Sequence, residues 1–361
     1  MDEFSWAYAS GRIKIAEKEL LPGSTLRQMA DAKTLEAAIA SLRDTCYGRY
    51  LTETRASGTP FDLPLQKALR DAYESVLSYA GEPLAVTVFR ARHDFHNVKV
   101  AVKNLCLGMP WEEEALSIVG SLGAPAISSL LRGGALPEPE AGRPSDIDFA
   151  GREDVATLGK AVVSAYLAAR DLLQKEKAGS GRAALALLAD GSVDASYYGW
   201  AASILTRLGY PELRRFLAAE ADLTNLRMAV RAARHRIPAS LFKQTVLSGG
   251  DADEGQLRDA YGPGLTRVEE LYSKTPWAGL ASSGAGLLRR QEPFTSWEKA
   301  CDDALMRVYR KGRYVAMGPE AAVGYLMDKE AEVRNLRVVL AGIECQAPST
   351  EILERLRETY V

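Results

Sequence analysis

The chain is 47% apolar and 25% charged, which is the composition of a soluble globular protein. Its 361 residues exceed the roughly 250–300 residues at which a single core stops growing, so we expect two or three lobes. The formal net charge of −2 excludes a strong overall attraction to nucleic acid or anionic lipid. No run approaches ~18 apolar residues, and residues 1–20 lack the apolar core of a signal peptide, which excludes a membrane span and predicts a cytosolic protein.

Apolar residues recur at helical spacing from the N-terminus to about residue 80. Ser24-Thr25 is expected to cap one helix, whose apolar face runs from Leu26 to Leu42 and which stops at Tyr47-Gly48. A second amphipathic helix is predicted over Leu63–Ala80. The N-terminal region is therefore predicted to be helical.

A pattern of acid, apolar, any residue, Asn, apolar and basic then occurs three times along the chain. The copies are Asp94–Val102, Asp222–Val230 and Glu332–Leu340, and a proline follows thirteen residues after each asparagine. The first copy is expected to lie in a helix that starts at Pro83, because proline at the first helical position sacrifices no hydrogen bond. The chain therefore uses one helical unit three times.

On a helical wheel, each copy places apolar residues at i, i+3, i+7 and i+10 in one arc, which predicts a stripe that faces the core. In the first copy this stripe is Phe95, Val98, Val102 and Leu105. The acid and the asparagine share one flank of the stripe, and the basic residue lies on the other. We therefore expect each polar side chain to find its partner on another element.

The segments between the repeats alternate helical patterns with breaks. Residues 133–148, rich in Pro, Gly and acids, form the clearest linker, and helical patterning resumes at about Asp154. Gly179-Ser-Gly181 breaks it, and the Gly/Ser-rich run Trp277–Gly286 is predicted to be a loop. A helix is predicted again from Ser296 to Arg310. Strand-like alternation is almost absent, so the predicted fold class is all-α.

Motifs of enzymes and metal proteins are missing. The chain has no phosphate loop, dinucleotide fingerprint, nucleophile elbow or zinc-protease motif, and its four cysteines form no CxxC pair. Asp302-Asp303 could bind magnesium, although a solvated helix face is the simpler interpretation. His93 and His96 could share a metal, but neither other repeat has a histidine at these positions. We therefore predict no catalytic residue, no cofactor and no metal site.

Basic residues gather near the end of the second repeat and in two later places. They fit either ordinary cations at a helix C-terminus or a docking patch for an acidic protein surface. Without a positive net charge or interleaved aromatic residues, nucleic acid is not expected as a partner. The docking-patch candidates are Arg231, Arg234, Arg236, Arg289, Arg290, Arg310, Lys311 and Arg313.

The repeated acid–Asn–basic group has a structural and a functional interpretation, and the two are compatible. In the first, a half-buried Asn and carboxylate bind neighbouring helix ends and fix how each lobe packs. In the second, the three helices line a shared central surface. If the amide of Asn225 is buried and bonded, Asn225→Leu should destabilise the middle lobe by about 1–3 kcal/mol.

These residues also resemble a known family. Arg92–Lys99, Glu220–Arg227 and Lys329–Arg337 look like the three repeat helices of the C subunit of V/A-type rotary ATPases, the family that includes the eukaryotic V-ATPase d subunit. Tyr8-Ala-Ser-Gly-Arg12 with Leu20-Leu21, and Thr45-Cys-Tyr47-Gly48, are similar to the family's opening. The resemblance runs in order over essentially the whole chain.

The resemblance implies a funnel-shaped protein of three helical lobes with pseudo-threefold symmetry and a central cavity that receives the central axle. It implies a peripheral rotor part on the cytoplasmic face of the membrane proteolipid ring, in one copy per complex. A rotor part of this kind catalyses nothing, binds no cofactor, does not insert into the membrane, and passes torque between axle and ring during proton or sodium transport.

The three repeats predict lobes at 1–140, 141–250 and 251–361, with repeat helices at about 83–108, 211–236 and 319–346. The candidates for lobe packing or for the axle socket are Arg12, Asp94, Asn97, Lys99, Asp222, Asn225, Arg227, Glu332, Asn335 and Arg337. Two alternatives stay open. One is a helical adaptor scaffold unrelated to rotary ATPases, and the other is a helical metal-dependent enzyme that uses Asp302-Asp303 or His93 and His96.

Overall fold

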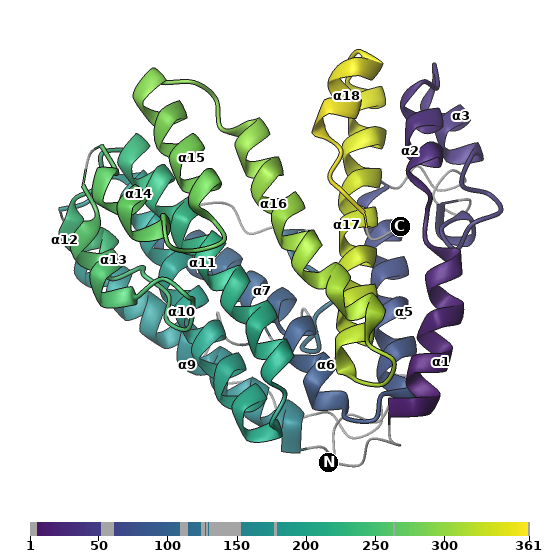
Figure 1. Ribbon diagram of the computed structural model, residues 1–361, viewed down its shortest axis with the longest axis horizontal. Helices are drawn as coiled ribbons and strands as arrows, with labels where there is room; N and C mark the ends of the chain where they lie inside the picture. Colours follow the sequence, from purple (N-terminus) through teal and green to yellow (C-terminus); the bar gives the residue numbers. More distant parts are fainter. Residues whose placement is uncertain are drawn as a thin grey trace. The chain divides into compact units, whose positions relative to one another are not determined.

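A computed structural model describes residues 6–51, 61–108, 115–123, 127, 129, 153–176, 179–262 and 264–359. Within these ranges the chain forms helices and no strand, which confirms the all-α prediction (Figure 1). None of the helices in this described part is both long enough and apolar enough to cross a membrane. The predicted linker at 133–148 lies outside the described residues.

The chain divides into two compact units. One joins both ends of the chain, Met1–Val86 and Thr295–Val361, and the other is Thr87–Phe294. Helix α6 (Pro83–Arg90) carries the boundary between them.

The first unit is built around α17 (Pro319–Glu344), drawn in yellow-green to yellow in Figure 1. This helix contacts the other main helices of the unit and is buried around most of its circumference up to Leu340. An apolar surface on all sides is typical of a helix enclosed by others. The surrounding elements are α1 (Ala7–Ala16), η2 (Glu17–Glu19), α2 (Gly23–Ala30), α3 (Leu35–Ala40), α5 (Asp62–Tyr79), α16 (Thr295–Tyr309), η4 (Arg310–Tyr314) and α18 (Ser349–Arg355).

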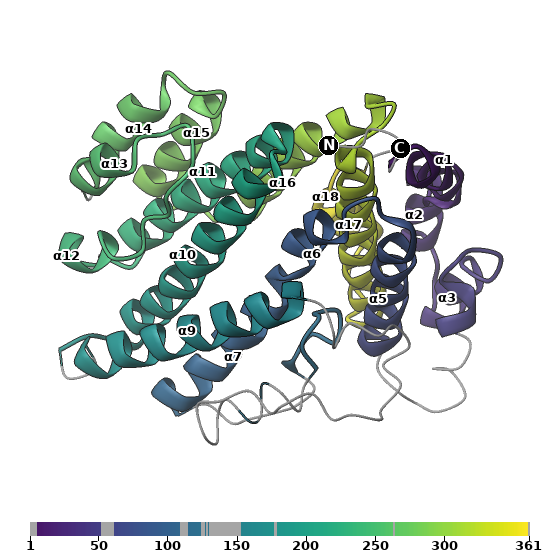
Figure 2. The same ribbon diagram turned by 90° about the horizontal axis from the view of Figure 1, so that it is seen from below.

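The second unit contains the other two repeat helices. Helices α7, α9 and α10 pack against one another, and α10 also packs against α11, as Figure 2 shows. Phe95 of α7 and Tyr197 of α10 fix part of this contact, with ring centroids 5.4 Å apart. The helices are α7 (Arg92–Leu107), α9 (Glu153–Glu176), α10 (Arg182–Leu208), α11 (Pro211–Arg234), α12 (Ala239–Phe242), α13 (Glu254–Ala260), α14 (Thr266–Tyr272) and α15 (Ala278–Arg290).

Two predictions about helix extent were wrong. The single helix predicted from Ser24 is two helices, α2 and α3, because the Thr34 hydroxyl accepts a hydrogen bond from the Ala37 N–H (3.2 Å) and starts a new helix. The predicted loop Trp277–Gly286 is the first part of α15. Its small residues form the buried face of that helix, which packs on α11 and α14, so tertiary packing outweighs weak helix propensity.

The first repeat helix departs from the prediction in two details. Ala91 separates α6 from α7, whereas α11 and α17 run without interruption from their prolines. Leu105 was expected in the core-facing stripe but is 49% exposed, while Phe95, Val98 and Val102 are buried. The stripe therefore ends one turn earlier than its periodicity predicts.

Candidate functional site

The three asparagines of the repeat make the same pair of hydrogen bonds. Each side-chain amide donates to the backbone C=O, and accepts from the backbone N–H, of one residue further along the chain. The pairs are Asn97 with Ser117 (2.9 and 2.7 Å), Asn225 with Leu247 (2.9 and 2.8 Å) and Asn335 with Arg357 (3.0 and 2.9 Å). We call each pair an asparagine clamp.

An asparagine suits this position because its amide carries one acceptor and two donors on a short side chain, which match the N–H and C=O of a single peptide residue. All three asparagines are buried, so the bonds also satisfy polar groups that water cannot reach. Each clamp therefore holds a non-helical segment against the repeat helix that precedes it.

The acid of the first two copies holds the same segment a little further on. Each carboxylate is fully buried and accepts hydrogen bonds from two consecutive backbone N–H groups. Asp94 accepts from Ser121 (3.0 Å) and Leu122 (2.7 Å), and Asp222 accepts from Asp251 (2.9 Å) and Ala252 (3.1 Å). Acid and asparagine together fix each segment at two places.

A glycine precedes each of these carboxylate contacts for a steric reason. A Cβ added to Gly120 would overlap the Asp94 carboxylate, and one added to Gly250 would overlap that of Asp222. The backbone can approach the carboxylate only where there is no side chain. These glycines belong to the site, although the sequence pattern did not single them out.

The third copy uses a different segment. The Glu332 carboxylate accepts from the Leu21 N–H, from the Tyr47 hydroxyl (2.6 Å) and from the Lys329 ammonium (2.8 Å). The acid of the third repeat therefore binds the N-terminal region instead of a segment that follows its own helix.

The N-terminal region that Glu332 binds repeats the local structure that surrounds Asp222. Thr45 and Thr275 each cap a turn with the hydroxyl, donating to a carbonyl three residues earlier (2.7 and 2.8 Å) and accepting from the N–H two residues later (3.2 Å in both). The residues that follow, Tyr47 and Trp277, donate to Glu332 (2.6 Å) and Asp222 (3.1 Å). Residues 21–47 thus donate hydrogen bonds to the acid of α17 in the same way as residues 251–277 donate them to the acid of α11.

One substitution between these segments explains a further difference. Leu21 corresponds to Asp251, and Pro22 corresponds to Ala252, whose N–H binds Asp222. Proline has no N–H to donate. In the third copy the Lys329 ammonium supplies the donor that Pro22 lacks.

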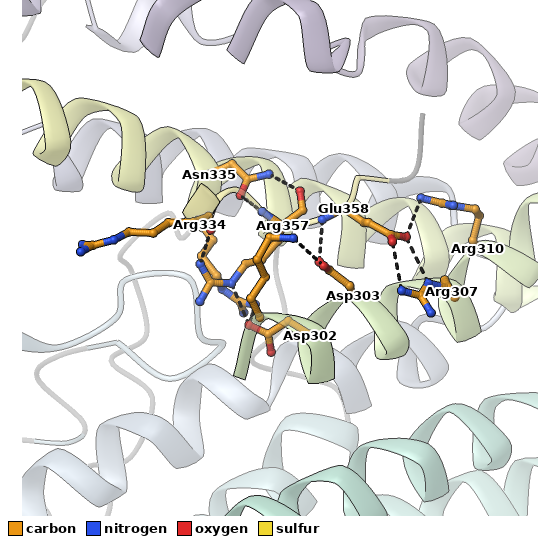
Figure 3. Close-up of polar contacts among 10 residues, drawn as sticks. Asp302, Asp303, Arg307, Arg310, Arg334, Asn335, Arg357 and Glu358 are labelled. Atoms are coloured by element: carbon orange, nitrogen blue, oxygen red, sulfur yellow. Dashed lines mark hydrogen bonds and ion pairs between the residues drawn. The ribbon is translucent and has the colours of Figure 1, made fainter. Parts of the chain in front are cut away.

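The C-terminal segment of the third copy is held by a carboxylate from α16 in addition to its clamp (Figure 3). Asp303 accepts from the Glu358 N–H (2.7 Å) and pairs with Lys299 (2.8 Å). Asp302 pairs with Arg357 (2.7 Å) and Arg334 (3.5 Å). The acidic pair considered as a magnesium site thus binds cations and backbone, and no group of three or more metal-ligating side chains occurs among the described residues.

Burial sets the electrostatics of the acids. Burial raises the pKa of Asp94 to about 6, against the lowering effect of its two backbone hydrogen bonds, and it also raises the pKa of Asp222. Burial is the largest single effect on Lys329 and lowers its pKa, but the Glu332 carboxylate, with Cys46 and Tyr325, together outweighs it and the pKa is raised. Lys329 and Glu332 therefore form a buried ion pair in the first unit.

The basic residues of the repeat lie apart from the clamps. Lys99 pairs with Asp194 of α10 at 2.6 Å, and Arg337 pairs with Asp62 at the start of α5. Both partners lie on another element, as expected. Arg227 is half-buried on α11.

The remaining predicted residues lie elsewhere in the two units. Arg12 is exposed on α1, with its guanidinium 5.2 Å from the centre of the Tyr79 ring. The side chain of His93 contacts the Ser117 hydroxyl (3.1 Å) beside the first clamp, and His96 is exposed. The structure therefore does not group Arg12 with the asparagine clamps.

The docking-patch candidates form two groups. Arg231, Arg234 and Arg236 are exposed at the end of α11, and Arg234 reaches the Gln291 carbonyl (3.4 Å) beside the end of α15. Two of the candidates, Arg289 and Arg290, lie at that end and pair with Glu269 (2.7 Å) and Glu292 (2.9 Å). The other three candidates, Arg310, Lys311 and Arg313, lie on η4 in the first unit.

The family model that matches the chain and the individual proteins that resemble it point to the same family. The model of the ATP synthase (C/AC39) subunit family matches residues 9–138 and 164–355. The chain is 22% identical over 348 residues to the C subunit of the V-type sodium ATPase of Enterococcus hirae, a match that covers 96% of this chain and 97% of that protein. It is 20% identical over 356 residues to the C subunit of the A-type ATP synthase of Methanocaldococcus jannaschii, covering 95% and 84%. The family match includes all three repeat helices.

Proposed function

The chain belongs to the ATP synthase (C/AC39) subunit family, and we propose that it is the non-catalytic C subunit of a V/A-type rotary ATPase or ATP synthase. In this role it couples the central axle to the membrane proteolipid ring and transmits torque during proton or sodium transport. The observation that carries the proposal is the family match, which runs over nearly the whole chain and includes every copy of the repeated helix. The names of the two relatives, both C subunits of rotary ATPases, agree with it.

We infer that the acids and asparagines of the repeat pack the lobes and do not line the socket. They are buried, and they hold backbone segments within the same compact unit. A part that transmits torque has to resist deformation, and segments fixed at two points to a buried helix are stiff. The proposed arrangement is three similar lobes with pseudo-threefold symmetry around a central cavity.

The proposed partners follow from the same role. The central-axle subunits enter the socket, and the ring binds from the membrane side, with one copy of this protein per complex because one chain already holds three repeats. The exposed arginines at the end of α11 are the best candidates for docking on an acidic protein surface. The protein is then peripheral, on the cytoplasmic face of the membrane.

A reconstitution experiment tests this role. Membranes that contain the proteolipid ring are washed with salt to remove this protein, and the purified chain is added back, alone and with the purified axle subunits. We expect rebinding to the washed membranes and binding to the axle. Failure to bind either one would overturn the proposal.

Charge reversal then tests the docking surface. Arg231, Arg234 and Arg236 are replaced together by Glu, and the matched control replaces three other exposed cations, Arg27, Lys33 and Arg43. We expect the first variant alone to lose binding at low ionic strength, where exposed charge pairs act, and the difference between the variants to shrink as added salt screens those charges. Equal binding by both variants would show that the α11 arginines are not part of the interface. The rotor role itself would still be decided by the reconstitution experiment.

A further inference from the structure

The first unit contains a cavity of about 380 Å³ that the family role does not explain. It lies among α1, residues 46–50, α5 and α17, all within one compact unit. The volume is in the range of small-molecule sites. The cavity is lined by Arg12 and Glu19, by Cys46, and by Tyr79, Tyr325 and Lys329 among others.

The Tyr325 hydroxyl is the first hydrogen-bond donor on the lining of the cavity. Tyr325 is only 6% exposed, yet within the described part of the chain its hydroxyl has no hydrogen-bond partner. Its oxygen is not one of the fully enclosed unbonded polar atoms of the described residues, so it is accessible from the cavity. Tyr325 lines the cavity, so its hydroxyl can donate to an acceptor that enters the cavity.

Lys329 is a second donor at the same place. Its ammonium carries three N–H groups, and it binds the Glu332 carboxylate (2.8 Å) and the Cys46 sulfur (3.4 Å). A thiol is a weak acceptor, and the third N–H has no bond in the structure of the described residues. The α17 side of the cavity therefore offers a cation and a hydroxyl to an acceptor.

The charges along the lining favour an anion over a cation. Arg49 and Asp71 pair with each other (3.5 Å), whereas Arg12 has no carboxylate within ion-pair distance among the described residues. Glu19 also lines the cavity, and it partly offsets Arg12. The unpaired donors thus exceed the unpaired acceptors.

We propose that this cavity binds a carboxylate group, which accepts hydrogen bonds from Tyr325 and Lys329 while the Arg12 guanidinium adds a positive charge at the α1 side. A carboxylate has only acceptors, so it complements a lining with spare donors. The carboxylate belongs either to a free small molecule or to an acidic side chain of a partner. Neither source depends on the rotor role.

Titration of the purified full-length chain tests the proposal. Malonate is added, with sodium chloride at equal ionic strength as the reference, and binding is followed by calorimetry and by the melting temperature. We expect saturable binding of malonate and no saturable effect of chloride. Tyr325→Phe removes only an unbonded hydroxyl, so this variant should fold, and its malonate affinity should fall about 10-fold to 100-fold, the size expected for a hydrogen bond to a charged group.

Three further variants test the charge argument. Arg12→Gln should weaken malonate binding, and Glu19→Gln should strengthen it, because each changes the charge that faces the ligand. Arg27→Gln, at an exposed arginine outside the cavity, is the control and should leave the affinity unchanged. An affinity that is the same in the wild type, Tyr325→Phe and Arg12→Gln would overturn the proposal, as would the absence of saturable binding to every carboxylate probe.

A capped hexaglutamate peptide distinguishes the two sources. Binding of both probes with the same loss in Tyr325→Phe supports an acidic side chain as the occupant. Binding of malonate alone supports a free small carboxylate.

Discussion

Replacing Asn225 by Leu removes the middle asparagine clamp while nearly keeping the volume of the side chain. In the wild type, the Leu247 N–H donates to the Asn225 amide oxygen (2.8 Å), and the Leu247 C=O accepts from the Asn225 amide nitrogen (2.9 Å). Leu247 is 1% exposed. The substitution leaves the buried N–H and C=O of Leu247 without a hydrogen-bond partner, and water cannot replace the lost amide. Because each of the two unpaired buried groups costs about 1–3 kcal/mol, the variant should lose about 2–6 kcal/mol of unfolding free energy, more than expected from the sequence alone.

Chemical denaturation followed by circular dichroism measures the loss, and hydrogen exchange locates it. The amide of Leu247 should exchange much faster in the variant, while amides in the first unit keep their protection. The control is Asn104→Leu, the same change at a half-buried residue of α7 outside the clamps, which should shift stability by less than about 1 kcal/mol. An Asn225→Leu protein with the stability and Leu247 protection of the wild type would refute the clamp.

Two further perturbations address the carboxylates. Because burial raises the pKa of Asp94 to about 6, the folded state holds this proton more tightly than the unfolded state, and the associated stability is present below pH 4 and lost as pH rises through 6. The unfolding free energy of the wild type minus that of Asp94→Asn should therefore be larger at pH 4 than at pH 7, by up to about 3 kcal/mol, and the reverse order would contradict the assignment. Gly250→Ala should cost about 1–3 kcal/mol because the new Cβ meets the Asp222 carboxylate, whereas Gly262→Ala enters open space; equal melting temperatures would show that the loop yields freely.

The repeated pattern predicted the fold class because both the helical spacing of apolar residues and the prolines that begin the helices are properties of the side chains. Pro211 and Pro319 begin α11 and α17, as proline at a first helical position should. The partners of the clamps could not be predicted, because Asn225 binds the backbone of Leu247, and a backbone N–H or C=O is the same in every residue. The chain carries no side-chain signature for such a contact.

Some contacts of the acids did leave a signal in the sequence. A threonine followed two residues later by an aromatic residue occurs at Thr45 and Tyr47 and again at Thr275 and Trp277. The first pair was predicted only as part of the family's opening, so the likeness between the surroundings of Glu332 and Asp222 was missed. Helix α15 was missed for another reason, since its small residues resemble a loop until a neighbouring helix covers them.

The acid of the third repeat joins segments that lie further apart in the sequence than the asparagines do. Each asparagine binds a segment that follows its own helix, which a chain can achieve locally and in any order. Glu332 instead joins the last repeat helix to Leu21 and Tyr47, near the opposite end of the chain. Without the N-terminal segment the buried Glu332 carboxylate would keep Lys329 as a donor but lose the Leu21 N–H and the Tyr47 hydroxyl, so that segment stabilises α17. The third repeat is therefore completed by a contact between segments far apart in the sequence, and this contact holds residues 21–47 to α17 in a protein for which stiffness is the proposed function.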